Sequence, residues 1–334
     1  MDSCAMRRKT VENMFYVWYI VRENRMNNSL LKVGQMKKSE NVVYIDRATG
    51  RECTESVMGD GALRFAYETA LGRSLWGILF GSGFLSRLMG LYYDSYLSRK
   101  KISSLTSIPG CEAAEAEKDA AEYSSFNDFF IRKLKPGVRP ADMAENIFCS
   151  PGDGRLLIYP DIQPDHPITV KGAVRPLNDL CGKMLTEKSY DVAVLRLAPV
   201  DYHRYHFPCD CVQTGVSCKI AGKYHSVNPI AIRKRPDLFV ENTRVITELS
   251  SEKFGTFYYI EVGAFGVGSI VQTAVGEQHR KLEEKGYFKF DGSTIILVLE
   301  HGKIAFSPDL LEASSAGKEV RLKMGETIGS AFAE

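Results

Sequence analysis

The sequence predicts an α+β fold in which N-terminal amphipathic helices are followed by a mainly antiparallel, β-rich domain. Between residues 62 and 101, apolar residues recur at three- and four-residue steps, which is the period of a helix. Beyond residue 145, the apolar runs are short, rich in β-branched residues and bounded by glycine or proline. No helices of crossover length separate these runs, so we expect neighbouring strands to pair antiparallel.

Composition and charge narrow the class of partner. The 334 residues are 44% hydrophobic and 25% charged, enough for one large or two modest cores. Residues 1–101 contain 16 basic and 10 acidic residues, a net charge of +6, whereas the remainder contains 27 and 31, a net charge of −4. A basic and apolar first third favours a membrane surface over nucleic acid. Scattered solvated charge is the alternative.

The eight cysteines form no recognisable framework. Cys209 and Cys211 are the only close pair, and no histidine lies at zinc-finger spacing from the thiols. We therefore predict unpaired thiols in a reducing compartment and no metal site.

The chain divides into three predicted parts. Residues 1–40 are an extension of uncertain role, because their apolar run, 14–21, is too short to span a bilayer and precedes no cleavage site. Residues 41–121 are predicted to be a helical membrane-associating region with a linker, and residues 122–334 a β-rich catalytic domain. Aromatic and basic residues between 62 and 101 suit a lipid headgroup interface, although a helical layer packed on the core is the alternative.

Local patterns within these parts predict individual helices and strands. Glycines at 81 and 83 break the helical segment into at least two helices, and residues 103–121 are predicted to be a linker with a short acidic helix at 112–117. Ser124 and Ser125 are predicted to cap a helix beginning at Phe126. The predicted strands are 192–197, 257–262, 295–299, 303–306 and 319–324.

Three turn-like segments of the last part carry reactive side chains. Asp153 lies in a bend set by proline and two glycines, and Ser293 follows Gly292 at the start of a β-branched run. His203 and His206 lie three residues apart in a segment bounded by prolines, so they can share a cavity if it is helical or serve two separate tasks. Ordinary turns, or a metal-binding histidine pair, are the alternatives.

Together, Asp153, His206 and Ser293 have the residue types of an acid, base and nucleophile set. A Gly-Ser bond at a strand entrance also leaves the glycine carbonyl open to attack by the serine hydroxyl.

These segments and three others resemble, in order, motifs of the phosphatidylserine decarboxylase family over roughly residues 43–334. The matching segments are the aromatic-basic signature at 126–140, the bend at 150–154, the two-histidine segment at 201–208, the strand region at 262–270, Gly292-Ser293-Thr294 and the turn at 324–326.

The resemblance implies a self-cleaving enzyme that converts Ser293 into a pyruvoyl cofactor after cutting the Gly292–Ser293 bond. It implies that His206 is the base for Ser293, that Asp153 orients His206, and that His203 acts on the lipid substrate. The expected reaction is decarboxylation of phosphatidylserine to phosphatidylethanolamine at a membrane surface. We expect a homodimer of cleaved two-chain protomers, peripheral to the cytoplasmic face of a bacterial cell membrane.

Two residues depart from the family pattern. Asp291 stands where a glycine or an apolar residue is more common, and Leu282 replaces a common glycine.

The alternative functions are a serine hydrolase that uses Asp153, His206 and Ser293 on an external ester, a non-catalytic lipid-binding protein, and a pyruvoyl decarboxylase of another serine-headed lipid or of a soluble amino acid. The apolar helices argue against a soluble substrate.

Overall fold

The computed structural model describes residues 43–55, 83–165, 167–170, 173–222, 242–263, 270–290 and 293–332. The predicted extension at 1–40, the helical pattern between 62 and 82, and residues 291 and 292 lie outside these ranges.

Two strands at the centre of the fold are buried on both faces. They are β7 (Tyr190–Leu197) and β16 (Ser293–Glu300), and their near-continuous apolar runs are typical of strands covered on both sides. Because side chains alternate along a strand, the odd-numbered residues from 295 to 299 enter one core cluster and the even-numbered residues enter another. The run that follows Ser293 therefore anchors it in the middle of the protein.

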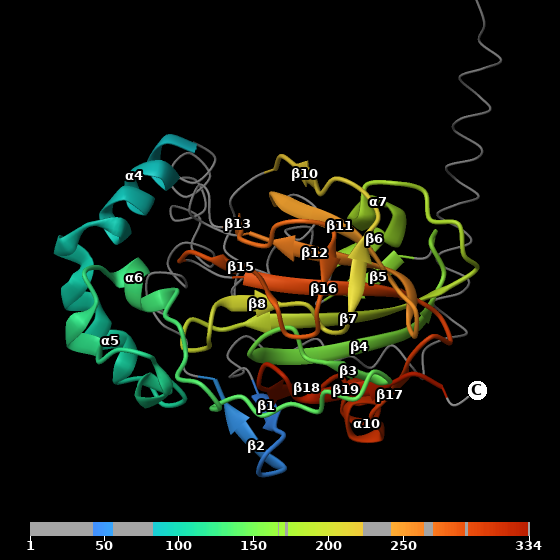
Figure 1. Ribbon diagram of the computed structural model, residues 1–334, viewed down its shortest axis with the longest axis horizontal. Coiled ribbons are helices and arrows are strands. Elements are labelled where there is room, and N and C mark those ends of the chain that lie inside the picture. The colour runs from blue at the N-terminus through green and yellow to red at the C-terminus, as the bar shows by residue number, and fades with distance from the viewer. Residues whose placement is uncertain are drawn as a thin grey trace, which may run out of the picture. The chain divides into compact units, whose positions relative to one another are not determined.

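Within the described ranges the main sheet has 11 strands in the order β14-β9-β11-β12-β16-β7-β4-β18-β1-β2, with β10 paired to β11 (Figure 1). Among the described strands of this sheet every pair is antiparallel except β1 with β18. The remaining bounds are β1 (Val43–Asp46), β2 (Arg51–Thr54), β4 (Gly154–Ile162), β9 (Cys211–Gln213), β10 (Cys218–Ile220), β11 (Arg244–Ser251), β12 (Gly255–Val262), β14 (Gln278–His279) and β18 (Glu319–Leu322).

Smaller elements cover the two faces. One core cluster joins the main sheet to helix α10 (Pro308–Ser315) and to two three-stranded sheets, β13-β15-β8 and β17-β19-β3. The other cluster joins it to helix α7 (Leu177–Cys181), which follows the hairpin β5-β6. The bounds of these strands are β3 (Ile147–Cys149), β5 (Pro167–Val170), β6 (Ala173–Pro176), β8 (Arg204–His206), β13 (Ile270–Gln272), β15 (Glu284–Phe288), β17 (Ala305–Phe306) and β19 (Thr327–Ser330).

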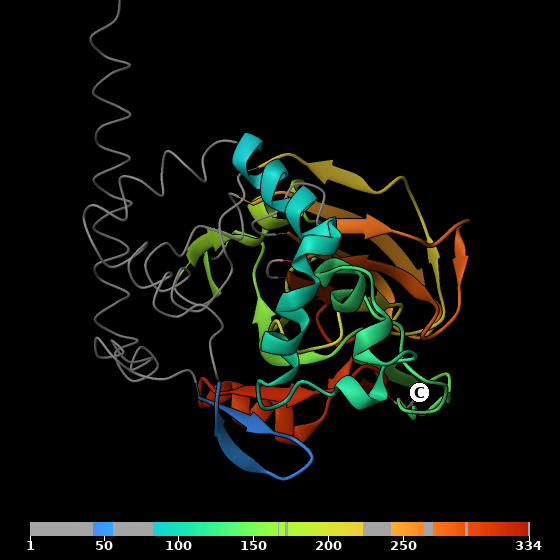
Figure 2. The same cartoon turned by 90° about the vertical axis from the view of Figure 1, so that its left-hand side faces the viewer.

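A group of helices packs beyond the Leu197 end of β7. The group contains α4 (Gly83–Asp94), the 3-10 helix η1 (Tyr96–Lys100), α5 (Lys101–Thr106) and α6 (Phe126–Phe130), and Figure 2 shows it facing the viewer. Its apolar side chains form a third cluster with residues 198 and 200, directly after β7. As predicted, the Ser125 hydroxyl caps α6 by accepting a hydrogen bond from the Asp128 N–H at 3.1 Å.

The predicted α+β class is confirmed, and the strands predicted at 192–197, 257–262 and 295–299 are present. The strand predicted at 319–324 ends at Leu322, because Gly325 turns the chain with a φ of +87°. The predicted linker at 103–121 contains the end of α5, the 3-10 helix η2 (Ala113–Glu115) within the predicted acidic helix at 112–117, and the start of the 3-10 helix η3 (Ala120–Glu122). Ala116 also forms an isolated β-bridge with Leu134.

Across the described ranges, no helix combines the length and the apolar character needed to cross a membrane.

Candidate active site

Ser293 and His203 form the centre of the candidate site. Ser293 is the first residue of β16, and His203 directly precedes β8. Both are 0% exposed. The Nδ1 atom of His203 lies 2.9 Å from Ser293 Oγ, which is hydrogen-bond distance. The structure thus pairs a buried hydroxyl with a buried imidazole, the pairing that nucleophilic catalysis requires.

The second nitrogen of His203 fixes the direction of this hydrogen bond. Nε2 lies 3.0 Å from the carbonyl oxygen of Ala198, which can only accept. Nε2 must therefore carry the hydrogen of the neutral ring, and Nδ1 is left with a lone pair. The Ser293 hydroxyl consequently donates to Nδ1, the direction in which a general base withdraws a proton.

The surroundings of His203 keep its ring neutral. Burial lowers its pKa to about 3, and the positive charge of Arg132 acts in the same direction. The ring also stacks on Phe130, the last residue of α6, with 3.8 Å between ring centroids. An unprotonated His203 is therefore the stable form at neutral pH.

A buried carboxylate shapes the turn that presents His203. Asp201 accepts a hydrogen bond of 2.6 Å from the Ala198 N–H and forms an ion pair with Arg155. Its own N–H donates to the Ala198 carbonyl at 2.9 Å, the same oxygen that His203 Nε2 contacts. This turn fixes the imidazole relative to the end of β7.

His206 occupies a different environment. Its Nδ1 donates to the Leu282 carbonyl at 3.0 Å, and its Nε2 lies 3.2 Å from the Tyr202 hydroxyl. Burial lowers the pKa of His206, while the hydrogen bond to Leu282 and the negative charges of Glu284 and Asp153 oppose that shift. Among the described residues, no hydrogen bond joins His206 to Ser293.

Asp153 is held by groups that are distant along the chain. Arg139 donates to its two carboxylate oxygens, from Nε at 3.1 Å and from Nη2 at 2.7 Å, and the Met324 N–H donates to Oδ1 at 2.8 Å. Arg139 is itself paired with Glu115, which places the predicted linker against this site. Neither Arg139 nor Met324 was predicted as a site residue, although both lie in segments that carried the resemblance.

The structure therefore brings together Ser293 and His203, not the predicted pair of Ser293 and His206. The physical reason is that residues 204–206 form a strand that directly follows His203, and along an extended chain side chains three residues apart point to opposite sides. Asp153 lies within electrostatic reach of His206 without a hydrogen bond to it in the described part of the chain. The roles assigned to Asp153, His203 and His206 stay predictions.

Leu282 supplies the carbonyl that fixes His206, and its backbone has the left-handed conformation, with a φ of +62°. This explains why a glycine is expected there: a side chain in this conformation costs about 1 kcal/mol. The Leu282 N–H also donates to the carbonyl of Phe207, the residue after β8, at 2.8 Å, so both backbone groups of Leu282 are hydrogen-bonded to the segment 206–207.

We expect Leu282→Gly to change the free energy of unfolding by less than about 1 kcal/mol, because relief of strain offsets the loss of a half-buried side chain. In contrast, Leu282→Val is expected to lower it by about 2 kcal/mol, since a β-branched residue tolerates positive φ poorly. Urea denaturation measures both values. Equal losses for the two variants would mean that side-chain packing, not the backbone conformation, determines stability at this position.

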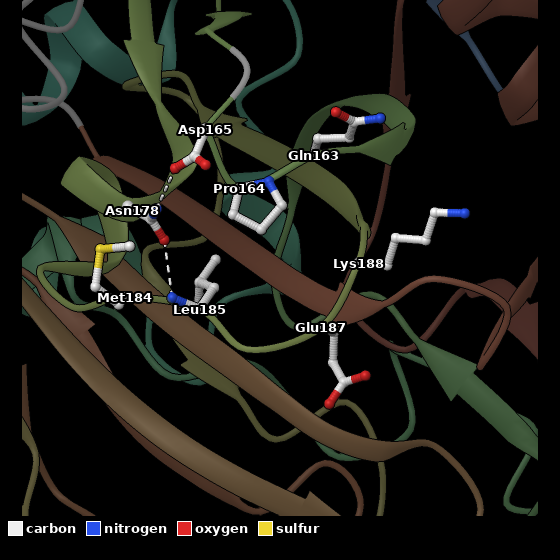
Figure 3. Close-up of a pocket in the computed structure, with 8 residues that line it drawn as sticks. All are labelled: Gln163, Pro164, Asp165, Asn178, Met184, Leu185, Glu187 and Lys188. Carbon is white, nitrogen blue, oxygen red and sulfur yellow. Dashed lines mark hydrogen bonds between the residues drawn. The ribbon is translucent and has the colours of Figure 1, made fainter.

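A pocket of about 380 Å³ lies elsewhere, beside α7 and the segment before β7. Its Asn178 side chain is already bonded to Asp165 at 2.9 Å and to the Leu185 N–H at 2.8 Å (Figure 3). Ser293 pairs with Leu197, at the opposite end of β7. The pocket is therefore separate from the candidate site.

The described residues contain no group of three or more His, Cys, Asp or Glu side chains that could hold a metal ion.

A family model and similar proteins from three bacteria indicate the same family for this chain. The family model for phosphatidylserine decarboxylase matches residues 126–330. The chain is 42% identical to the phosphatidylserine decarboxylase proenzyme of Chlamydia caviae, over 90% of this chain and 100% of that relative. It is 41% identical to the proenzyme of that name from Clostridium botulinum (85% and 97%). For the one from Desulfitobacterium hafniense the identity is 39% (86% and 98%).

Proposed function

Because the chain belongs to the phosphatidylserine decarboxylase family of carboxy-lyases, we propose that it cuts itself between Gly292 and Ser293 and uses the resulting pyruvoyl group to decarboxylate phosphatidylserine. The product is phosphatidylethanolamine. The observation that carries the proposal is the buried Ser293 hydroxyl, which donates to the neutral His203 imidazole at 2.9 Å.

Self-cleavage begins with proton transfer from Ser293 Oγ to a histidine. Oγ then attacks the Gly292 carbonyl carbon, and the peptide C–N bond breaks as an ester forms and the Ser293 nitrogen takes a proton. Loss of the Ser293 α-proton eliminates the Gly292 carboxylate and leaves a dehydroalanine. Addition of water and release of ammonia yield a pyruvoyl group at the start of the fragment 293–334, separate from the fragment 1–292.

The environment of residue 293 fits such a group. Residue 293 is buried in the uncut chain and lies next to an imidazole, so a proton can be held at His203 Nδ1. The pyruvoyl carbonyl supplies an electron sink for the negative charge left by loss of carbon dioxide. The His203 ring stacks on Phe130 and lies beside residue 293. This place supports the predicted action of His203 on the substrate.

The base for self-cleavage has two candidates. The hydrogen bond to Ser293 favours His203 in the uncut chain. The resemblance favours His206 with Asp153, and the negative charge of Asp153 acts on His206 in the direction that a supporting carboxylate should. To serve as the base, His206 would have to exchange its contacts with Tyr202 and Leu282 for one with Ser293.

Burial of Ser293 argues against the alternative of a serine hydrolase. An external ester must reach the nucleophile, whereas the Ser293 side chain is fully covered in the uncut chain. Attack on the preceding peptide bond requires no such access. A non-catalytic lipid-binding protein would leave the contact between Ser293 and His203 without a purpose.

The surface of the helical group supports action at a membrane. Four large apolar side chains on or next to α4 and η1 are exposed, and the exposed Lys100 and Lys101 follow them. The apolar residues are Leu88 (53%), Leu91 (64%), Tyr96 (67%) and Leu97 (74%). We propose that this surface rests on the cytoplasmic face of a bacterial membrane, where a homodimer of two-chain protomers meets its phospholipid substrate.

Intact-mass measurement of purified protein tests the proposal. We expect two chains, 1–292 and 293–334, the second blocked to Edman degradation because a pyruvoyl group has no amine. Ser293→Ala is the matched control and should give one chain of 37.3 kDa without decarboxylase activity. A wild-type protein that is active as a single full-length chain would overturn the proposal.

A further inference from the structure

The residues immediately before the proposed cleavage site are held by two helices. Asn127 in α6 accepts a hydrogen bond from the Phe290 N–H at 3.0 Å through its side-chain oxygen. Its side-chain nitrogen donates to Asp94, the last residue of α4, at 2.9 Å. Lys289 donates to the same Asp94 carboxylate at 2.9 and 3.1 Å. Residues 289 and 290 are therefore attached to both α4 and α6.

Chemistry fixes the orientation of the Asn127 side chain. A carboxylate can only accept, so Asp94 must face the NH₂ group, and a backbone N–H can only donate, so Phe290 must face the oxygen. Asn127 is 2% exposed, so water is a poor substitute for either partner. A residue of similar size that lacks either the donor or the acceptor would lose the hydrogen bond to Asp94 or the one to Phe290.

The ring of Phe290 connects this attachment to the catalytic imidazole. It lies in edge-to-face contact with Phe126 and Phe130, at centroid distances of 4.9 and 5.2 Å. Phe130 in turn stacks on His203. Phe290, shortly before the proposed cleavage site, and His203, beside Ser293, thus contact the same helix, α6.

We propose that Asn127 is a positioning residue for self-cleavage, with Asp94 as its anchor. On one side of the scissile bond the chain is fixed at Phe290, and on the other it enters the β16 ladder at Ser293, which pairs with Leu197. Only residues 291 and 292 lie between these two fixed points. Such restraint limits where the two residues between these points can place the scissile bond, and a misplacement of about 1 Å can slow a reaction about 10²-fold.

This inference rests on the proposed self-cleavage, and an exchange of side chains tests it. Asn127→Asp sets two carboxylates against each other, so self-cleavage is expected to slow about 10²-fold. Adding Asp94→Asn restores a donor and acceptor pair between α4 and α6 while the Phe290 N–H keeps an acceptor. The double variant should return to within about threefold of the wild-type rate. Intact-mass time courses measure the rates, and thermal melts verify that each variant is folded.

A second measurement does not depend on cleavage. In the Ser293→Ala background, Asn127→Ala should increase hydrogen exchange of the Phe290 amide at least about tenfold, because its acceptor is lost. The positioning role would be overturned if Asn127→Asp cleaved at the wild-type rate. It would also be overturned if the double variant Asn127→Asp with Asp94→Asn cleaved no faster than Asn127→Asp alone. Failure of the wild type itself to cleave would instead refute the proposed function, and unchanged exchange at Phe290 would still refute the attachment.

Discussion

Replacement of His203 by alanine is expected to slow self-cleavage about 10³-fold, within the range that a positioned general base contributes. The reason is direct: His203 Nδ1 is the hydrogen-bond acceptor of the Ser293 hydroxyl, and its pKa of about 3 keeps it unprotonated. The measurement is the rate at which fragment 1–292 appears in freshly synthesised chain.

His206→Ala is the matched comparison, since it removes the other imidazole of the same segment. If His206→Ala blocks cleavage while His203→Ala cleaves normally, the base is His206 supported by Asp153, and His203 acts only on the substrate. The pH dependence of the cleavage rate provides a second test of which histidine is the base. With His203 as base, cleavage should not slow between pH 8 and pH 5 through protonation of the base, because its pKa lies at about 3.

The same shift has a consequence for stability. The pKa of His203 is lower in the folded than in the unfolded chain, so the unfolded chain takes up the proton first on acidification. Its contribution is therefore constant above about pH 6.5 and is lost progressively between about pH 6.5 and pH 3, at up to about 1.4 kcal/mol per pH unit. His203→Ala should be correspondingly less sensitive to acid over this window.

Lys285→Met is expected to lower the free energy of unfolding by about 3–5 kcal/mol, the usual effect of leaving one member of a buried ion pair alone. Lys285 in β15 donates to Glu261 in β12 at 2.5 Å, and these side chains are 2% and 0% exposed. Lys285 also donates to Thr247 at 3.0 Å and to Gln272 at 2.8 Å. Urea denaturation in the uncut Ser293→Ala background measures the change.

The double variant Lys285→Met with Glu261→Leu is the control, because it removes both charges from the interior. It should recover most of the lost stability, as an apolar pair of similar volume often equals a buried ion pair. If the double variant is as unstable as the single one, the loss comes from packing or from Thr247 and Gln272, not from an isolated carboxylate.

The fold could be predicted as far as local pattern reaches. The run after Ser293 is apolar on both faces, so its strand was visible in sequence and is confirmed as β16. The strand β11 was not predicted, because charged and hydroxyl residues interrupt it (Arg244, Thr247, Glu248 and Ser250). Its pairing with β12 over its whole length supplies the stabilisation that its composition does not indicate.

The candidate site could be predicted as a set of segments but not as a set of contacts. Ser293 and His203 are 90 residues apart, and Met324 lies 171 residues from the carboxylate that it holds. Spacing in sequence gave no information on these distances. The choice between His203 and His206 depended on whether residues 204–206 are helical or extended, which a three-residue segment does not reveal.

The position of β16 and β18 in the main sheet affects how the proposed two-chain form stays together and whether it can refold. Both strands belong to residues 293–334, and they lie between β12 and β7 and between β4 and β1. If the Gly292–Ser293 bond is cut as proposed, we expect the short chain to remain in place, because its departure would open the sheet at two positions. Reassembly after full unfolding, however, becomes an encounter of two molecules whose effective concentration is no longer set by a covalent link. Under this proposal we expect the cut protein to depend on a slow rate of unfolding, and the chain to fold before it is cut.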